Sequence, residues 1–250
     1  MKRSINSLLG YTIKGMDGEI GKVEEFYFDD RTSTIRYLVV KTGGWLSEKK
    51  VLISPEAFQK PELESKTFSV NLTQEKIKNS PDIDTDKPVS RKQEELMRGY
   101  YSWPGYYGNG MYGYPGFGMW GYPLVEVRGT EKEMIQRKAK EHAADNSHLR
   151  STDEVTGYTI HATDGDIGEV KNFIVEDATW KIHFLVVETG NWFSEKKVLI
   201  SPQWIKDVKW EEQKVTINHS KDGVKNSPEY DSSQPINDTY ENSLNDYYEK

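Results

Sequence analysis

The chain has 250 residues, 29% of them charged and 35% hydrophobic, which is enough for one or two domains with buried cores. Its net charge of −7 argues against nucleic-acid binding, and the absence of cysteine excludes disulfides, thiol catalysis and cysteine-ligated zinc. The N-terminus lacks the apolar core of a signal peptide, and no run of about 18 apolar residues predicts a membrane-spanning helix, so we expect a cytoplasmic protein.

The chain contains an internal duplication. At an offset of 147, residues 3–84 align with residues 150–231 without a gap and share about 37 identities. The segment TGGWLSEKKVLISP at 42–55 returns as TGNWFSEKKVLISP at 189–202. We therefore predict two tandem repeats with these boundaries.

Each repeat is predicted to be rich in β-strands. Strands of the first repeat are expected at 11–14, 20–28, 35–41, 49–53 and 66–72. In the second repeat, residues 213–219 match the last of these strands, and a short helix is expected from Thr73 in the first. Five or six short strands in about 80 residues predict a small β-barrel or a half-open sandwich.

Two turn motifs recur in both repeats. Asp17-Gly18 and Asp164-Gly165 join apolar runs and predict hairpins, because glycine accepts the positive φ of a tight turn. Gly21 and Gly168 follow, and we interpret them as marking a bulge or a close approach inside a small barrel. The carboxylates of DGDIGE at 164–169 lack the spacing of a calcium loop, so we expect no metal there.

The expected strand at 35–41 is apolar on both faces and so requires cover on both. We predict that the two repeats pack as a pseudo-two-fold pair through Leu38 and Val40 and their counterparts Leu185 and Val187.

Three segments lie outside the repeats. Residues 85–129 are expected to be a linker, in which positions 99–124 hold ten aromatic residues, eight glycines and three prolines without a charge. Residues 130–148 are predicted to form a connector helix with a capping box. The acidic residues 232–250 are predicted to be a disordered tail.

Several aromatic residues are candidates for partner contacts. Trp45 and Trp192 occupy equivalent loops, where each is either a lid over one end of a barrel or an anchor for a partner. Tyr106, Tyr107 and Trp120 lie in the aromatic linker, which either packs internally or binds outward.

The pattern GYTIxxxDGxIGxV…LVVxTGxW…KKVLISP resembles the PRC-barrel domain. That small β-barrel is shared by the cytoplasmic part of the photosynthetic reaction centre H subunit and a bacterial ribosome-maturation factor. The second copy and the aromatic stretch between the copies look like bacterial tandem PRC-barrel proteins of unassigned function, and the resemblance covers both repeats, about two-thirds of the chain. The resemblance implies an all-β-dominated fold of two PRC-type barrels joined by the Gly/aromatic linker and one connector helix. It also implies docking or assembly without catalysis.

We therefore expect a non-enzymatic protein–protein interaction module without cofactor or metal. Two alternatives stay open, an accessory of a membrane electron-transfer complex of the H-subunit kind and a small-ligand-binding barrel. The chain differs from the H subunit in one respect. The H subunit has a membrane-spanning helix before its barrel, and none is predicted here. Homo-oligomer formation and peripheral membrane association also stay open, whereas nucleic-acid binding is not expected.

Overall fold

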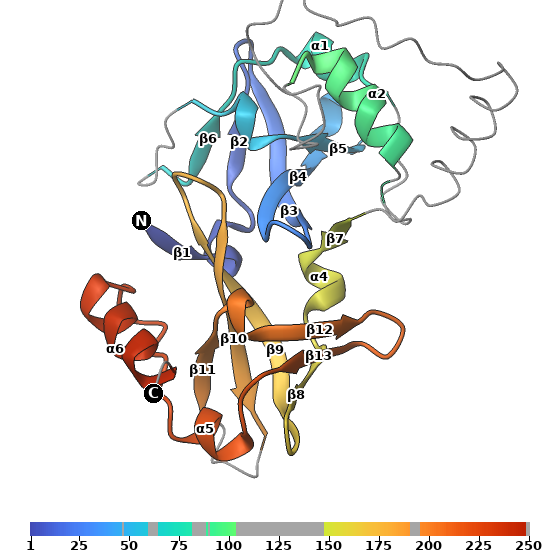
Figure 1. The fold of residues 1–250 in the computed structure, drawn as a ribbon. Helices are drawn as coiled ribbons and strands as arrows, with labels where there is room; N and C mark the ends of the chain where they lie inside the picture. Colours follow the sequence, from blue (N-terminus) through green and yellow to red (C-terminus); the bar gives the residue numbers. More distant parts are fainter. Residues whose placement is uncertain are drawn as a thin grey trace, which may run out of the picture. The chain divides into compact units, whose positions relative to one another are not determined.

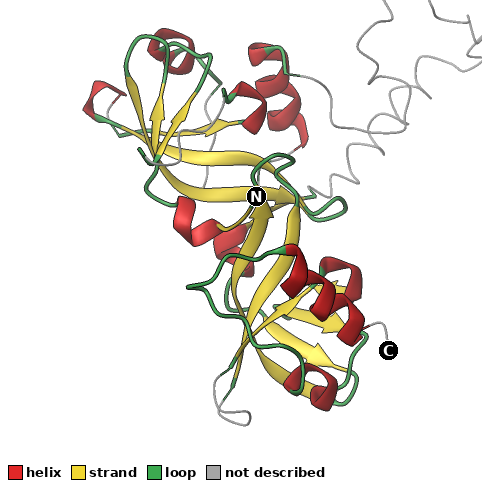
Figure 2. Ribbon diagram, turned by 90° about the vertical axis from the view of Figure 1, so that its left-hand side faces the viewer, coloured by secondary structure: helices red, strands yellow, loops and turns green. Residues whose placement is uncertain are grey.

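A computed structural model describes residues 1–46, 48–59, 65–81, 89, 91–103, 148–190 and 196–248. Residues 1–77 and 148–250 make one compact unit, which contains the strands of both repeats, and residues 78–147 make another. The first unit holds two β-sheets (Figures 1 and 2).

The first sheet is formed by strands of the first repeat in the order β5-β4-β3-β2-β6. Their bounds are β2 (Thr12–Lys14), β3 (Glu19–Asp29), β4 (Thr34–Thr42), β5 (Lys50–Ile53) and β6 (Thr67–Ser69). The second sheet has the order β11-β10-β9-β8-β13-β12. Its strands are β8 (Thr159–Ala162), β9 (Gly165–Glu176), β10 (Ile182–Thr189), β11 (Lys197–Ile200), β12 (Ile205–Lys209) and β13 (Lys214–Ile217).

The prediction of two β-rich tandem domains is confirmed, but the sheets are not closed barrels. Within the described residues, β5 and β6 are the two edge strands of the first sheet and do not pair with each other. The edge strands β11 and β12 of the second sheet do not pair with each other either. The strands that follow each β-hairpin return in parallel, β6 beside β2 and β13 beside β8. The sheets curve because register shifts interrupt the long β3–β4 and β9–β10 ladders.

Among the described helices, α2 and α6 have 11 residues each and the others have five or fewer. The α-helices are α1 (Gln74–Lys78), α2 (Arg91–Tyr101), α4 (Thr152–Val155), α5 (Lys221–Lys225) and α6 (Asp238–Tyr248). The 3₁₀ helices are η1 (Ile5–Leu8), η2 (Gly44–Leu46), η3 (Pro55–Ala57) and η5 (Pro202–Trp204).

The repeated second glycine has a steric cause. A Cβ on Gly21 would lie 2.0 Å from the Lys41 carbonyl oxygen, and a Cβ on Gly168 would lie 2.0 Å from that of Glu188. Register shifts occur beside both glycines in the pairing with β2 and β8. Any side chain here would push the first long strand away from the second, so the sheet can bend at this point only with glycine.

The two repeats exchange their first strands. β1 (Lys2–Ser4) precedes the first sheet in the chain but pairs with β9 of the second, and β7 (Leu149–Ser151) pairs with β3 of the first. Equivalent backbone bonds close the exchange, with Asp30 N–H donating to the His148 carbonyl at 2.9 Å and Asp177 N–H to the Met1 carbonyl at 3.0 Å. The N-terminus therefore lies where the sheets meet (Figure 2). Backbone pairing joins the repeats into one unit.

The prediction of a disordered acidic tail is wrong for residues 238–248, which form α6 beside the second sheet (Figure 1). Tyr240, Leu244 and Tyr248 recur every four residues and make one apolar face. That face packs on a cluster that includes Phe184 and Val186 of β10, and Leu244 is fully buried. The acidic composition of the tail concealed this stripe.

The expected linker also begins with a helix. Helix α2 lies in the second unit, and Glu94 and Arg98 pair along it at 3.6 Å. It corresponds to α6 residue by residue at the offset of 147, so the duplication extends beyond the predicted repeats. Tyr101 and Tyr248 are equivalent, and burial raises the pKa of each to about 12. The predicted connector helix at 130–148 lies outside the described residues except for His148, which directly precedes β7.

Candidate functional site

Two equivalent turns meet at the centre of the exchange. Ser33, between β3 and β4, and Trp180, between β9 and β10, occupy matching positions with left-handed backbones, at φ of 53° and 58°. The Ile35 N–H donates to the Trp180 carbonyl at 2.8 Å, and the Ile182 N–H donates to the Ser33 carbonyl at 2.7 Å. The turns therefore share one geometry and differ in the side chain at this position.

Trp180 enters an aromatic cluster of the other repeat. Its ring centroid lies 6.5 Å from that of Phe26, 5.4 Å from that of Phe58 and 5.8 Å from that of Phe68. Phe58 and Phe68 stack at 5.0 Å, and Tyr11 lies 5.2 Å from Phe68. A turn of the second repeat thus completes the core of the first.

At the equivalent place the second repeat has a cavity. The counterparts of Phe26, Phe58 and Phe68 are Phe173, Ile205 and Val215, and all three line a cavity of about 230 Å³ whose opposite side includes Ser33. Its other lining residues are Phe28, Asp30, Arg31, Val155, Ile182, Leu185, Pro202, Val208 and Trp210. Serine replaces tryptophan and two aliphatic residues replace phenylalanine, so the space that is filled in the first repeat is hollow in the second.

Charged groups stand at one edge of this cavity. The Asp30 carboxylate lies 3.0 Å from Nδ1 of His148 and accepts from Nε of Arg150 at 3.2 Å. The Arg150 guanidinium lies 3.9 Å from the ring centroid of Trp210, a cation–π contact. These contacts hold the lining residues Asp30 and Trp210 in place beside the apolar walls.

The matching carboxylate in the other turn is Asp177. It accepts from the N-terminal ammonium at 2.6 Å and from Nε of Arg3 at 2.9 Å. Burial opposes ionisation of Asp177, but these hydrogen bonds outweigh burial and hold the pKa of its carboxyl below the usual value.

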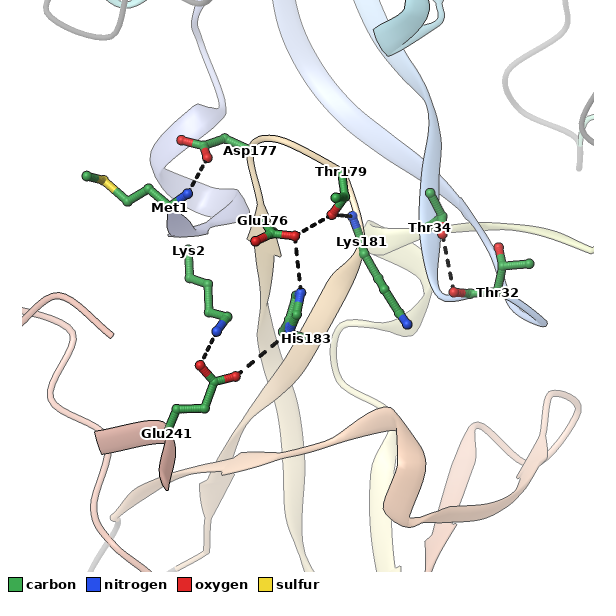
Figure 3. A network of polar contacts seen from close by, with 10 residues as sticks. All are labelled: Met1, Lys2, Thr32, Thr34, Glu176, Asp177, Thr179, Lys181, His183 and Glu241. Carbon is green, nitrogen blue, oxygen red and sulfur yellow. Dashed lines mark hydrogen bonds and ion pairs between the residues drawn. The ribbon is translucent and has the colours of Figure 1, made fainter. Parts of the chain in front are cut away.

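A further network fastens the exchanged N-terminal strand to α6. Figure 3 shows Lys2 and His183 directed at Glu241, and His183 also directed at Glu176. Nε2 of His183 lies 3.6 Å from Glu176, which also accepts from the Thr179 hydroxyl at 2.6 Å. The Thr179 hydrogen bond, with help from His183, lowers the pKa of Glu176. Polar contacts thereby tie β1, β9, β10 and α6 together.

The sequence profile described as the PRC-barrel domain matches residues 2–76 and 151–224, more than half of the chain. The chain belongs to the PRC-barrel family. It is also similar to a Deinococcus radiodurans protein named "Uncharacterized protein", at 28% identity over 109 residues, which are 42% of this chain and 39% of that protein. This chain therefore spans about two fifths of the relative's length. In the described part of the chain, no helix is both long and apolar enough to span a bilayer.

The four aliphatic residues predicted to join the PRC-barrel repeats are all buried, and their packing across the junction stays a prediction. Leu38 and Leu185 lie opposite Phe26 and Phe173 in the ladders, and opposed residues share a face of a sheet. Val40 and Val187 follow two positions later on the same faces, and both are fully buried. Leu185 also lines the cavity beside Ser33 of the other repeat, and backbone hydrogen bonds of the exchanged strands and turns join the repeats.

The predicted turn aspartates have a second role. Oδ1 of Asp17 accepts from the Gln74 N–H and Oδ1 of Asp164 from the Lys221 N–H, both at 2.8 Å, so each caps the helix that follows the last strand. Asp166 lies 2.5 Å from Nδ1 of His161, and this hydrogen bond lowers its pKa. Among the described residues, no group of three or more potential ligands is arranged to hold a metal.

The predicted aromatic contacts are not described in the structure. Trp45 lies in η2, but its side chain is outside the described set, and Trp192, Tyr106, Tyr107 and Trp120 lie outside the described residues. Their roles as lid, anchor or partner contact stay predictions.

Sequence reasoning missed Ser33 and Trp180. The signal was a mismatch, because DRTS and DATW differ at two of four positions and at the second of these serine stands where the other repeat has tryptophan. Departures from a repeat can mark function as clearly as identities do.

Proposed function

We propose that this PRC-barrel chain is a non-enzymatic interaction module that holds a partner protein on a rigid pair of sheets. The observation that carries the proposal is the reciprocal exchange of β1 and β7, which bonds each repeat to the other through its backbone. A pair fixed in this way loses little conformational freedom when a partner binds, and such pre-organisation favours affinity.

The positions of the duplicated residues support the same function. Gly21 and Gly168 allow the sheets to bend, and Asp30 and Asp177 receive the exchanged strands. What has been kept in both copies thus serves to build and join two surfaces.

Affinity capture from the native host tests the proposal. The baits are the full chain, the chain without residues 99–124, and an Arg3→Ala/Arg150→Ala variant that weakens both arms of the exchange. We expect a reproducible partner on the full chain and less of it on the double variant, with the shortened chain showing whether the aromatic segment contributes.

Two results would overturn the proposal. One is the absence of any reproducible partner. The other is turnover of a metabolite that is lost on changing Glu48 or Glu195, the glutamates of the repeated SEKK motif. Attachment to a membrane electron-transfer complex stays a prediction, and recovery of the protein only in the soluble fraction under every growth condition would contradict it.

A further inference from the structure

We propose that the cavity of the second repeat binds a small apolar aromatic molecule of about the size of indole. This proposal does not depend on the protein–protein function. It rests on the comparison of two equivalent spaces, one filled by the Trp180 indole and the other unfilled beside Ser33.

The size of the cavity selects the class of ligand. A volume of about 230 Å³ exceeds the roughly 150 Å³ of an apolar cavity that stays dry and binds benzene. It is below the roughly 300–1,000 Å³ of sites for drug-sized ligands. One ring or two fused rings fit this interval, and larger ring systems do not.

The chemistry of the lining selects an apolar ring. Phe173, Leu185 and Val215 supply aromatic and aliphatic walls, and in the filled counterpart Phe26 and Phe68 contact the Trp180 ring. The polar lining residues Asp30, Arg31 and Ser33 all belong to the turn between β3 and β4. A ring would lie among the apolar walls, with any polar substituent toward that turn.

The turn at Ser33 favours a small molecule over a side chain of a partner protein. In the first repeat the indole arrives on a turn of the other repeat. In the second repeat that turn is already present, and its backbone is held by the hydrogen bond between Ser33 and Ile182. A partner polypeptide could not enter by this route without displacing it, whereas a free ring requires no chain behind it.

The walls are also held apart, so the space does not simply close. Phe173 lies in β9, whose partners are β10, β8 and the exchanged β1. Trp210 is fixed by Arg150, and the Tyr158 ring lies 6.2 Å from it. An unfilled apolar space loses dispersion contacts, and an apolar occupant restores them.

Indole is the probe for the test, titrated into the full chain by calorimetry and ligand-observed NMR. We expect saturable binding of one indole per chain. Ser33→Trp places in the cavity the side chain that fills its counterpart, so binding should weaken at least about tenfold and Tm should rise by about 2–4 °C. The matched variant Trp180→Ser opens the equivalent space in the first repeat and should bind a second indole.

A wall variant covers the case in which Ser33→Trp fails to fold. Val215→Phe restores the residue that the first repeat has at this position, narrows the cavity and should also weaken indole binding. A short tryptophan-containing peptide serves as the second probe, and we expect it to bind much more weakly than indole.

Three outcomes would overturn the proposal. They are no saturable indole binding, indole binding unchanged in both cavity-filling variants, and a peptide that binds more tightly than indole. The last would assign the cavity to a partner side chain instead.

Discussion

The two repeats have equivalent spaces beside the turns at Ser33 and Trp180 but differ in what these spaces hold. Trp180 lies against three phenylalanines in the first, whereas Ser33 faces a cavity lined by Phe173, Ile205 and Val215 in the second. The turns that carry Trp180 and Ser33 make the same backbone hydrogen bonds. The side chain at this position could therefore differ between the repeats without disturbing the backbone hydrogen bonds that join them. One repeat of a duplicated fold can in this way contain a cavity while the junction is unchanged.

The comparison predicts equal damage where the repeats are alike. Gly168→Ala and Gly21→Ala should each destabilise by roughly 4 kcal/mol or more, because the added Cβ would lie 2.0 Å from a carbonyl oxygen. Urea unfolding measures both. Gly190→Ala is the control, since a Cβ there meets nothing within 4 Å and should cost little. A mild effect at either strand glycine would contradict the close-approach explanation.

The repeats should differ at the turn. Trp180→Ala removes a ring that contacts Phe26, Phe58 and Phe68, and should lower the free energy of unfolding by about 3 kcal/mol. Ser33→Ala removes only a hydroxyl beside a cavity and should change it by less than about 0.5 kcal/mol. Chemical denaturation of both variants gives the comparison. Similar losses in the two would mean that Trp180 does not complete a core.

Helix α6 should matter for the second repeat despite its acidic sequence. Leu244→Ala should cost about 2–3 kcal/mol, because Leu244 is fully buried against the outer face of β10. The exposed neighbour Asn242→Ala is the control and should be close to neutral. Thermal melts distinguish them, and an unchanged melt in Leu244→Ala would restore the disordered-tail prediction.

The smallest expected effect concerns acid stability. Because the pKa of Asp177 is lowered in the folded protein, its stabilisation is complete above the unfolded value of about 3.9 and is lost as pH falls through the folded pKa. Asp177→Asn should reduce the free energy of unfolding at pH 7 by about 1 kcal/mol and flatten its decline below about pH 4. Urea unfolding at several pH values measures this, and an unchanged acid profile would contradict the assignment.

Local chemistry explains what the sequence could predict. The Asp17-Gly18 turn, the strand at 35–41 and the place of Gly21 depend on neighbouring residues or on a close backbone approach that leaves glycine as its mark. The duplication itself could be found by aligning the sequence with itself at an offset of 147 residues.

Long-range pairing explains what could not be predicted. Lys2–Ser4 is too short to show any periodicity, and its partner β9 lies far along the chain, so the exchange left no local pattern. The same holds for the cavity, whose walls come from both repeats and whose volume depends on a serine that looks unremarkable in its turn. Helix α6 was predictable in principle, because Tyr247-Tyr248 repeats Tyr100-Tyr101 at the offset of 147.

The exchange also sets an order of events during translation. Trp180 is made 111 residues after Ser69 ends the last strand of the first sheet, a delay of about 5–20 s at 5–20 residues per second. The nascent first repeat lacks β7 until residue 151 has been made, and through the whole interval it lacks the indole that covers Phe58 and Phe68. Its aromatic surface is therefore bare on the ribosome until the second half emerges, which makes this half-built state the point at which chaperones would be needed.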